Sequence, residues 1–193
     1  AITARPITIT ADAGQTKVYG NADPASFTYT VEANSAGRGL VGSDTFSGAL
    51  SRAAGENVNS YAIGQGTLDN TNYAISYTPA NFAITARPIT LTASSATKVY
   101  GETDPSLAVT ITSGSLASVA TADVLADVTG TLSRSAGENV ANYNIALGTG
   151  TKAANYDITF NASNQAMGIT ARPINVSAEA GQAKTYGDGD PVC

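Results

Sequence analysis

Lysine, glutamate and asparagine recur together at two places in the chain, in a combination that can close an isopeptide bond. The two sets are Lys17, Glu56 and Asn57, and Lys98, Glu138 and Asn139. In such a site a buried lysine amine attacks the asparagine carboxamide while the glutamate carries the proton, and one ammonia is lost. The simpler interpretation, which we favour, is a solvated lysine and a polar turn in the phrase Ala-Gly-Glu-Asn.

Residues for enzyme chemistry are scarce. The 193-residue chain contains no histidine, which removes the commonest general base and the commonest metal ligand. Its one cysteine, Cys193, has no base partner, and no serine lies in a Gly-x-Ser-x-Gly context. Acid pairs such as Glu102 with Asp104 lie in a turn phrase, where solvated turn residues explain them. We therefore expect no enzyme activity and no cofactor.

That turn phrase, Lys-x-Tyr-Gly-x-x-Asp-Pro, occurs three times, at residues 17–24, 98–105 and 184–191. Glycine permits left-handed backbone, aspartate can hydrogen-bond nearby backbone and proline fixes φ, so the phrase predicts a turn whose tyrosine covers the edge of the core. Its residues are Tyr19, Gly20, Asp23 and Pro24; Tyr100, Gly101, Asp104 and Pro105; and Tyr186, Gly187, Asp190 and Pro191. The alternative is a carbohydrate or calcium site. One carboxylate per turn is too few for the oxygen shell of calcium, so we expect no metal site.

Composition excludes two classes of partner. Ten lysines and arginines are scattered among fifteen acids, which gives a net charge of −5, whereas nucleic acid requires a clustered basic face. The apolar runs are too short to cross a bilayer. With a single cysteine no intramolecular disulfide can form, so Cys193 is free to form a dimer. The first residues show no signal peptide.

Internal repetition dominates the sequence. The phrase Ile-Thr-Ala-Arg-Pro-Ile begins at residues 2, 84 and 169, and residues 50–58 match residues 132–140 almost letter for letter. Such ordered self-similarity indicates tandem structural modules. The second copy has small insertions, which loops tolerate and strands do not. They predict hairpin turns near residues 68–72 and 78–81.

Alternation of apolar and polar residues predicts β-strands. Ile7, Ile9 and Ala11 alternate with threonines, and Tyr73, Ile75 and Tyr77 alternate with small residues. This period of two is typical of half-buried strands. Helical spacing is weak and allows at most a short helical turn near Ser43 and Asp123. We expect a mainly β fold of small antiparallel modules placed end to end, either an immunoglobulin-like sandwich or a β-grasp-like fold with one short helix.

The apolar parity changes at each Arg-Pro dipeptide, which indicates that a strand leaves one core and enters another. Apolar residues occupy even positions before Arg87-Pro88 and odd positions after it. Proline is tolerated at such a strand start. We place the end of a preceding repeat at 1–5, module 1 at 6–87, module 2 at 88–172 and the start of a third module at 173–193. Without a Gly/Ser-rich linker the joins should be stiff.

The phrases Lys-Val-Tyr-Gly-x-x-Asp-Pro, Leu-Ser-Arg-x-Ala-Gly-Glu-Asn-Val, Asn-Tyr-x-Ile and Ile-Thr-Ala-Arg-Pro-Ile resemble the YGX-type MBG repeat domains of large bacterial surface and secreted adhesin-like proteins. The resemblance covers the whole chain. It implies an extracellular or cell-surface location and a non-enzymatic stalk or spacer, with neighbouring modules as partners. The alternative is that the modules themselves bind host or matrix glycans or proteins.

We expect the third copy to be incomplete. Residues 173–191 supply one strand and one turn with nothing to pair with, and an isolated strand cannot bury its apolar face. Ile174 and Val176 should therefore be disordered, pack back on module 2 or join a sheet of another chain. Disorder or packing back is favoured beyond Ser177.

Overall fold

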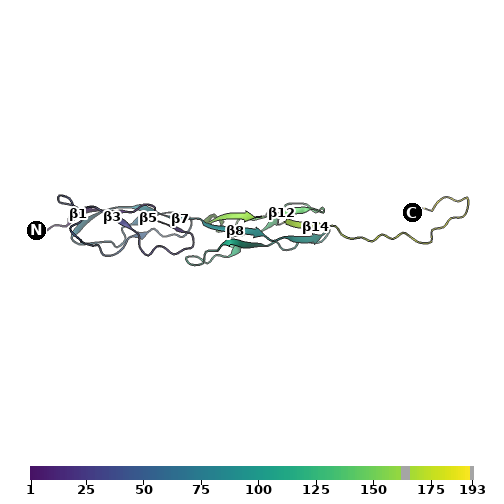
Figure 1. Cartoon of the computed structure of the whole chain (residues 1–193), viewed down its shortest axis with the longest axis horizontal. Helices are drawn as coiled ribbons and strands as arrows, with labels where there is room; N and C mark the ends of the chain where they lie inside the picture. The colour runs from purple at the N-terminus through teal and green to yellow at the C-terminus, as the bar shows by residue number, and fades with distance from the viewer. Residues whose placement is uncertain (162–165, 192–193) are drawn as a thin grey trace.

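The structure, a computed structural model, describes residues 1–161 and 166–191. Two elongated β modules lie end to end, and a tail extends away from the second module (Figure 1). The mainly β class is confirmed, because strands account for most of the regular structure. Residues 192 and 193 lie outside the described part, and with them the expectation of a dimer through Cys193.

Module 1 consists of two small sheets that follow one another along the rod. The first sheet has the order β3-β1-β6 and the second the order β2-β7-β5-β4. The strands are β1 (Arg5–Ala11), β2 (Thr16–Val18), β3 (Tyr29–Val31), β4 (Ser51–Arg52), β5 (Asn59–Gly64), β6 (Tyr73–Thr78) and β7 (Ala80–Thr85).

Module 2 repeats this arrangement. Its sheets have the orders β10-β8-β13 and β11-β12-β14-β9. Its elements are β8 (Arg87–Ala93), β9 (Ala96–Val99), β10 (Val109–Gly114), α1 (Leu125–Thr129), β11 (Ser133–Arg134), β12 (Asn142–Ala146), the short 3-10 helix η1 (Ala153–Asn155), β13 (Tyr156–Asn161) and β14 (Ala166–Thr170).

A parallel ribbon runs the length of each module. In module 1, β1 pairs in parallel with β6, and further along the chain β2 pairs in parallel with β7. The chain passes from the first sheet to the second between β1 and β2 and again between β6 and β7. It therefore enters at one end of the module and leaves at the other. In Figure 1 the labels β1, β3, β5 and β7 accordingly follow one another along the rod.

Three features of the pairing differ from the expectations. The modules are not purely antiparallel, because the ribbons are parallel. The predicted hairpins near 68–72 and 78–81 are wrong: β6 does not pair with β5 or β7, and Pro79 marks the change of sheet between β6 and β7. The helical turn near Asp123 exists as α1, whereas module 1 has no helix at the equivalent place.

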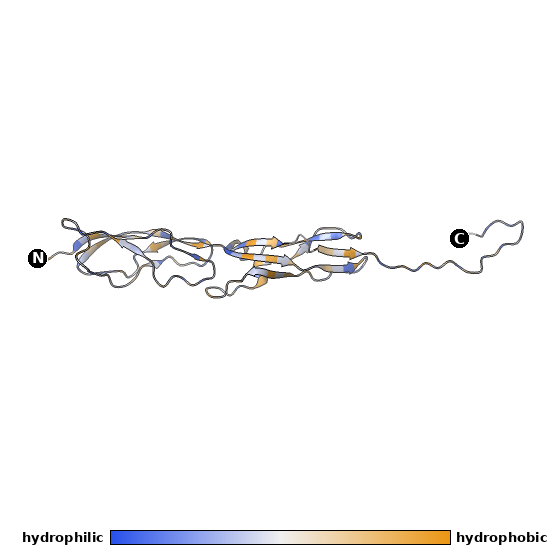
Figure 2. Cartoon of the chain, in the orientation of Figure 1, coloured by the Kyte–Doolittle hydropathy of each residue, from blue (hydrophilic) through white to orange (hydrophobic). Residues whose placement is uncertain are grey.

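Burial follows the parity that the sequence indicates. Phe82 and Ile84 are buried before the Arg87-Pro88 dipeptide, and Ile89 and Leu91 are buried after it. The apolar residues accordingly mark the strands in Figure 2. Most of the buried apolar residues are aliphatic.

The tail, residues 171–191, is exposed along its length and contains no strand. Ile174 and Val176 are 79% and 87% exposed. Of the three alternatives for these two residues, packing back on module 2 is therefore not observed. Among the described residues no helix is long and apolar enough to span a membrane.

Candidate functional site: ion clusters and the junction between the modules

Four charged side chains tie the turn phrase of module 1 to its Ala-Gly-Glu-Asn loop. Lys17 Nζ lies 2.7 Å from Asp23 Oδ1 and 2.5 Å from Glu56 Oε2. Arg52 donates from Nε to Asp23 Oδ2 at 2.7 Å and from Nη2 to Glu56 Oε1 at 2.5 Å. Each cation therefore contacts both acids, and the four residues form a closed network.

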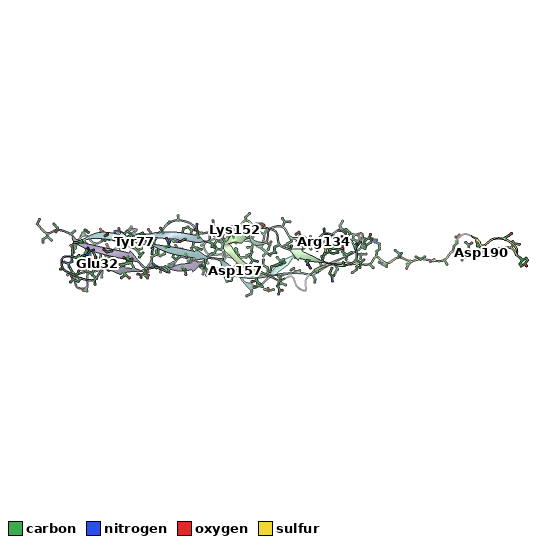
Figure 3. The ribbon with its side chains drawn as sticks, turned by 90° about the horizontal axis from the view of Figure 1, so that it is seen from above. Glu32, Tyr77, Arg134, Lys152, Asp157 and Asp190 are labelled. Carbon is green, nitrogen blue, oxygen red and sulfur yellow. The ribbon has the colours of Figure 1, made fainter. Side chains whose placement is uncertain are left out.

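Module 2 contains the same cluster, made of Lys98, Asp104, Arg134 and Glu138. Lys98 Nζ lies 2.6 Å from Asp104 and 2.5 Å from Glu138. Arg134, labelled in Figure 3, reaches the same two carboxylates at 2.6 Å and 2.5 Å. The cluster recurs because the turn phrase and the Leu-Ser-Arg-x-Ala-Gly-Glu-Asn phrase supply the same four residue types in both modules.

These contacts correct two expectations. The lysines are not solvated, because Lys17 and Lys98 are only 7% and 8% exposed. The turn aspartates bind the lysine and arginine side chains, where we had expected bonds to local backbone. Burial removes water from the ammonium group of the lysine, and the aspartate carboxylate supplies the opposite charge that this buried ammonium needs. An aspartate bonded to backbone N–H groups would leave the ammonium without that partner.

The predicted isopeptide residues are brought together only in part. Lysine meets glutamate in both modules, but its second partner is aspartate. The backbone carbonyls of Asn57 and Asn139 accept bonds from the hydroxyls of Tyr61 and Tyr143 at 2.8 Å. The carboxamide oxygen of Asn57 accepts a bond from module 2.

The electrostatics of the clusters keep every member charged. Hydrogen bonds from Arg134 and Lys98 lower the pKa of Asp104 to about 2 from an ordinary 3.8. Hydrogen bonds to Asp104 and Glu138 raise the pKa of Lys98. Amide formation needs a neutral amine and an un-ionised acid or amide as its target. The clusters therefore act as fixed ion networks and disfavour a covalent bond between lysine and aspartate.

Sequence reasoning gave Arg52 and Arg134 no role. Both are also stacked: the guanidinium of Arg52 lies 5.2 Å from the centre of the Tyr61 ring, and that of Arg134 lies 5.0 Å from that of Tyr143. The signal was present, since the arginine occupies the same place in both Leu-Ser-Arg phrases. Gly55 belongs to the same packing, because a Cβ there would lie 2.2 Å from the Tyr61 ring.

The second site is the junction between the modules, where a carboxylate from module 2 is completely buried. The side chain of Asp123 has 0% exposure. Its Oδ2 accepts bonds from the hydroxyls of Tyr19 at 3.0 Å and Tyr156 at 2.7 Å, and its Oδ1 lies 2.6 Å from Lys152 Nζ. Tyr19 comes from the turn phrase of module 1, so this carboxylate joins the two modules. Figure 3 shows Lys152 near the middle of the rod.

Direct packing accompanies this polar contact. The rings of Tyr19 and Tyr156 meet edge to face with centroids 5.5 Å apart. Gly20 has a φ of 78° and lies against Ala117, so that a Cβ at Gly20 would be 2.2 Å from the Cβ of Ala117. Buried residues of both modules consequently belong to one continuous apolar cluster.

Further bonds surround the buried carboxylate. Arg87 donates to the carbonyl of Tyr19 in module 1 at 3.2 Å and to the carbonyl of Ser115 in module 2 at 2.7 Å. The carboxamide of Asn155 accepts from the backbone of Val58 and donates to Asn57. The junction is thus fixed at Asp123, at Arg87 and at Asn155. Three separate attachments resist both bending and rotation of one module on the other.

The three turn phrases have different environments. Gly20, Gly101 and Gly187 all have left-handed φ, at 78°, 84° and 94°. Tyr19 is 1% exposed, whereas Tyr100 is 48% exposed at the far end of module 2 and Tyr186 is fully exposed in the tail. Within the tail Lys184 Nζ still lies 2.6 Å from Asp190. The proline of the first turn, Pro24, is exposed, and Pro105 is half-buried.

Comparison with known proteins identifies the repeated unit. Residues 7–83 and residues 89–165 each match the family model of the MBG domain (YGX type). No curated protein and no solved structure matches the chain. Because the matched segments include most of both modules, the family is established for the chain.

We expect the intact mass of the purified chain to equal the sequence mass, because Arg52 and Arg134 hold the acids ionised beside the lysines. Mass spectrometry under denaturing conditions tests this directly. A loss of one ammonia per module would reveal a lysine–asparagine bond, and a loss of one water a lysine–aspartate bond. Either loss would contradict the interpretation as ion networks.

Stability should fall on acidification between pH about 4 and about 2. The pKa of Asp104 is lowered from 3.8 to about 2 on folding, so its contribution is complete above its ordinary pKa and is lost as the pH falls through the lower value. Asp104→Asn should be less stable than the unmodified chain at pH 7 and approach it at pH 2. Thermal melts at several pH values measure this difference. Asp157→Asn, an exposed change in the same module (Figure 3), should keep the normal loss of stability. A constant gap for Asp104→Asn would contradict the assignment.

Gly20→Ala should destabilise the chain more than Gly101→Ala. Both positions have positive φ, so both substitutions carry the same backbone strain. At Gly20 the new Cβ meets Ala117 at 2.2 Å, whereas at Gly101 the nearest atom, from Arg172, is 3.6 Å away. Overpacking of this kind costs about 1–3 kcal/mol, which is the difference expected between the two variants in chemical denaturation. Equal losses would show that the junction does not contribute to stability.

Proposed function

The chain belongs to the MBG domain family of the YGX type, and we propose that its two repeats are a stiff, non-enzymatic spacer in a bacterial cell-surface or secreted adhesin. The observation that carries this proposal is the junction, where a buried carboxylate is shared by both modules. A flexible tether would leave such a group solvated. Its burial requires one fixed orientation of module 2 on module 1.

The parallel ribbons support a load-bearing role. Because β1 enters at one end of module 1 and β7 leaves at the other, tension along the rod pulls the two members of each ribbon past one another. In this geometry the hydrogen bonds of the ribbon are loaded together, whereas peeling breaks them one at a time. The fold therefore suits a segment that transmits force between its ends.

The chemistry of the described residues gives little support to catalysis. They contain no group of three or more histidine, cysteine, aspartate or glutamate side chains able to hold a metal. The acids that do gather are neutralised by lysine and arginine in the two ion clusters. Tyr100 and Tyr186 are the strongly exposed aromatic side chains among the described residues, and they lie in separate turns rather than on one binding face.

Small-angle X-ray scattering tests the spacer proposal. A compact particle of this length would have a radius of gyration of about 16 Å, and we expect a clearly larger value with a narrow distribution of distances between the modules. Asp123→Ala should broaden that distribution, because it removes the acceptor that Tyr19 and Lys152 share. A compact particle, or an unchanged distribution in the variant, would contradict a stiff junction.

A glycan array with the same chain tests the alternative function. We expect no saturable binding. A saturable signal that survives in Asp123→Ala would assign ligand binding to the modules themselves, since this variant alters the junction and leaves both ion clusters intact.

A further inference from the structure

The two ends of the rod expose residues whose equivalents in the other module are buried at the junction. At the C-terminal end of module 2, Tyr100 is 48% exposed and Val140 is 56% exposed. Their counterparts Tyr19 and Val58 are covered by the next module. Among the described residues, the first copy of the phrase is therefore covered by a neighbouring module and the second copy is not.

The C-terminal end of module 2 is already arranged as half of a junction. Arg172 donates from Nε to the carbonyl of Tyr100 at 2.9 Å, and Arg87 donates from Nη1 to the corresponding carbonyl of Tyr19. Arg172 also contacts the carboxylate of Glu102. Gly101 has the same left-handed backbone as Gly20, and its open side faces no backbone atom within 4 Å. Contacts within module 2 and with Arg172 thus hold this turn in the conformation that the first turn has at the junction.

The N-terminal end of module 1 presents the complementary half. Tyr73 donates its hydroxyl hydrogen bond to Asp44 Oδ2 at 2.6 Å and accepts one from the amide of Val41 at 3.0 Å. Tyr156 makes the same pair of bonds, to Asp123 and from Ala117. The acceptor that receives Tyr19 in the junction therefore has an equivalent at the free end.

A hollow of about 380 Å³ lies beside this acceptor, bounded by Val41, Asp44, Asn72, Tyr73 and residues 2–5. Asp44 is exposed, in contrast to Asp123, which is buried by Tyr19 and its neighbours. Asn72 is also exposed, whereas its counterpart Asn155 is buried and clamps the loop of the preceding module. This end thus has the acceptor, the clamp and the space that a Tyr-Gly turn requires.

We propose that the N-terminal end of module 1 and the C-terminal end of module 2 are the two halves of one head-to-tail interface, and that each takes a further repeat of the same kind. At the N-terminal end, the hydroxyl of the incoming tyrosine donates to Asp44, its ring packs on Tyr73 and the following glycine lies against Val41. The interface has one polarity, so that repeats add in a single direction. The proposal deepens the spacer function by specifying how successive repeats join.

A direct fusion of two copies tests the complementarity. Residues 1–172 of one copy are joined to residues 6–193 of a second, which recreates the phrase Ile-Thr-Ala-Arg-Pro-Ile at the join. The second copy carries Tyr100→Phe, so that the only residue 100 tyrosine belongs to the first copy. Nitration with tetranitromethane in the absence of thiol reductants, read by mass spectrometry, reports the exposure of each tyrosine.

In the single chain Tyr100 should be nitrated, Tyr186 should be nitrated strongly and Tyr19 should be protected. In the fusion Tyr100 should become as protected as Tyr19, while Tyr186 of the second copy is unchanged. Tyr100 that stays reactive while Tyr19 is protected overturns the proposal. Reactive Tyr19 also overturns it, because complementary ends must leave both copies folded.

Two matched controls separate docking from simple crowding. A flexible Gly-Ser spacer inserted at the join should restore the reactivity of Tyr100, because the turn can no longer be held against Asp44. Gly101→Val in the first copy should restore it as well, since the branched side chain would occupy the place where the second copy packs. Protection that persists in both controls would show that the interface is not the one proposed. A negative result in the fusion would leave the scattering test of the spacer function unaffected.

Discussion

The buried carboxylate of Asp123 is the constraint on which the arrangement of the two modules depends. An ionised group out of contact with water is tolerated only when its lone pairs are occupied by donors. For Asp123 those donors are Tyr156 and Lys152 from its own module and Tyr19 from the module before it. Apolar packing of Tyr19 on Tyr156 and Ala117 accompanies these polar contacts, and the directional hydrogen bonds to the carboxylate determine how module 2 is oriented. The hydroxyl of Tyr19 must be present for the donor set to be complete, which makes the junction selective for this turn.

Inside each module the ion cluster has the corresponding role. The cluster joins the turn phrase to the Ala-Gly-Glu-Asn loop and the arginine before it through charge. Isolated surface ion pairs contribute little to stability, but here Lys17 and Arg52 are buried and each contacts both acids. Stacking of Arg52 on the Tyr61 ring adds to the connection between these loops.

The sequence predicts the strands and the repeat well, because alternation and self-similarity are local or periodic signals. Ile7, Ile9, Ile89 and Leu91 are buried on the face that parity assigns to them. Pairing partners were not predictable in this way, since alternation identifies the buried face of a strand and not its neighbour. Asp123 was missed for a related reason. It lies in a stretch, residues 115–128, whose counterpart in module 1 is rich in glycine and differs from it in sequence, so comparison of the repeats did not identify it as part of a site.

The phrase Lys-x-Tyr-Gly-x-x-Asp-Pro combines two functions that act in opposite directions along the rod. Its lysine and aspartate bind back to their own module through the ion cluster, whereas its tyrosine and glycine contact the next one. Because all four residues belong to one turn, closing the cluster fixes the turn before docking, and less conformational entropy is lost when the tyrosine is buried. At the free end of module 2, Lys98 and Asp104 are paired in the cluster while Tyr100 remains exposed. The turn is thus formed by its own module and completed by the following one, which explains why both pairs of residues recur together in every copy of the phrase.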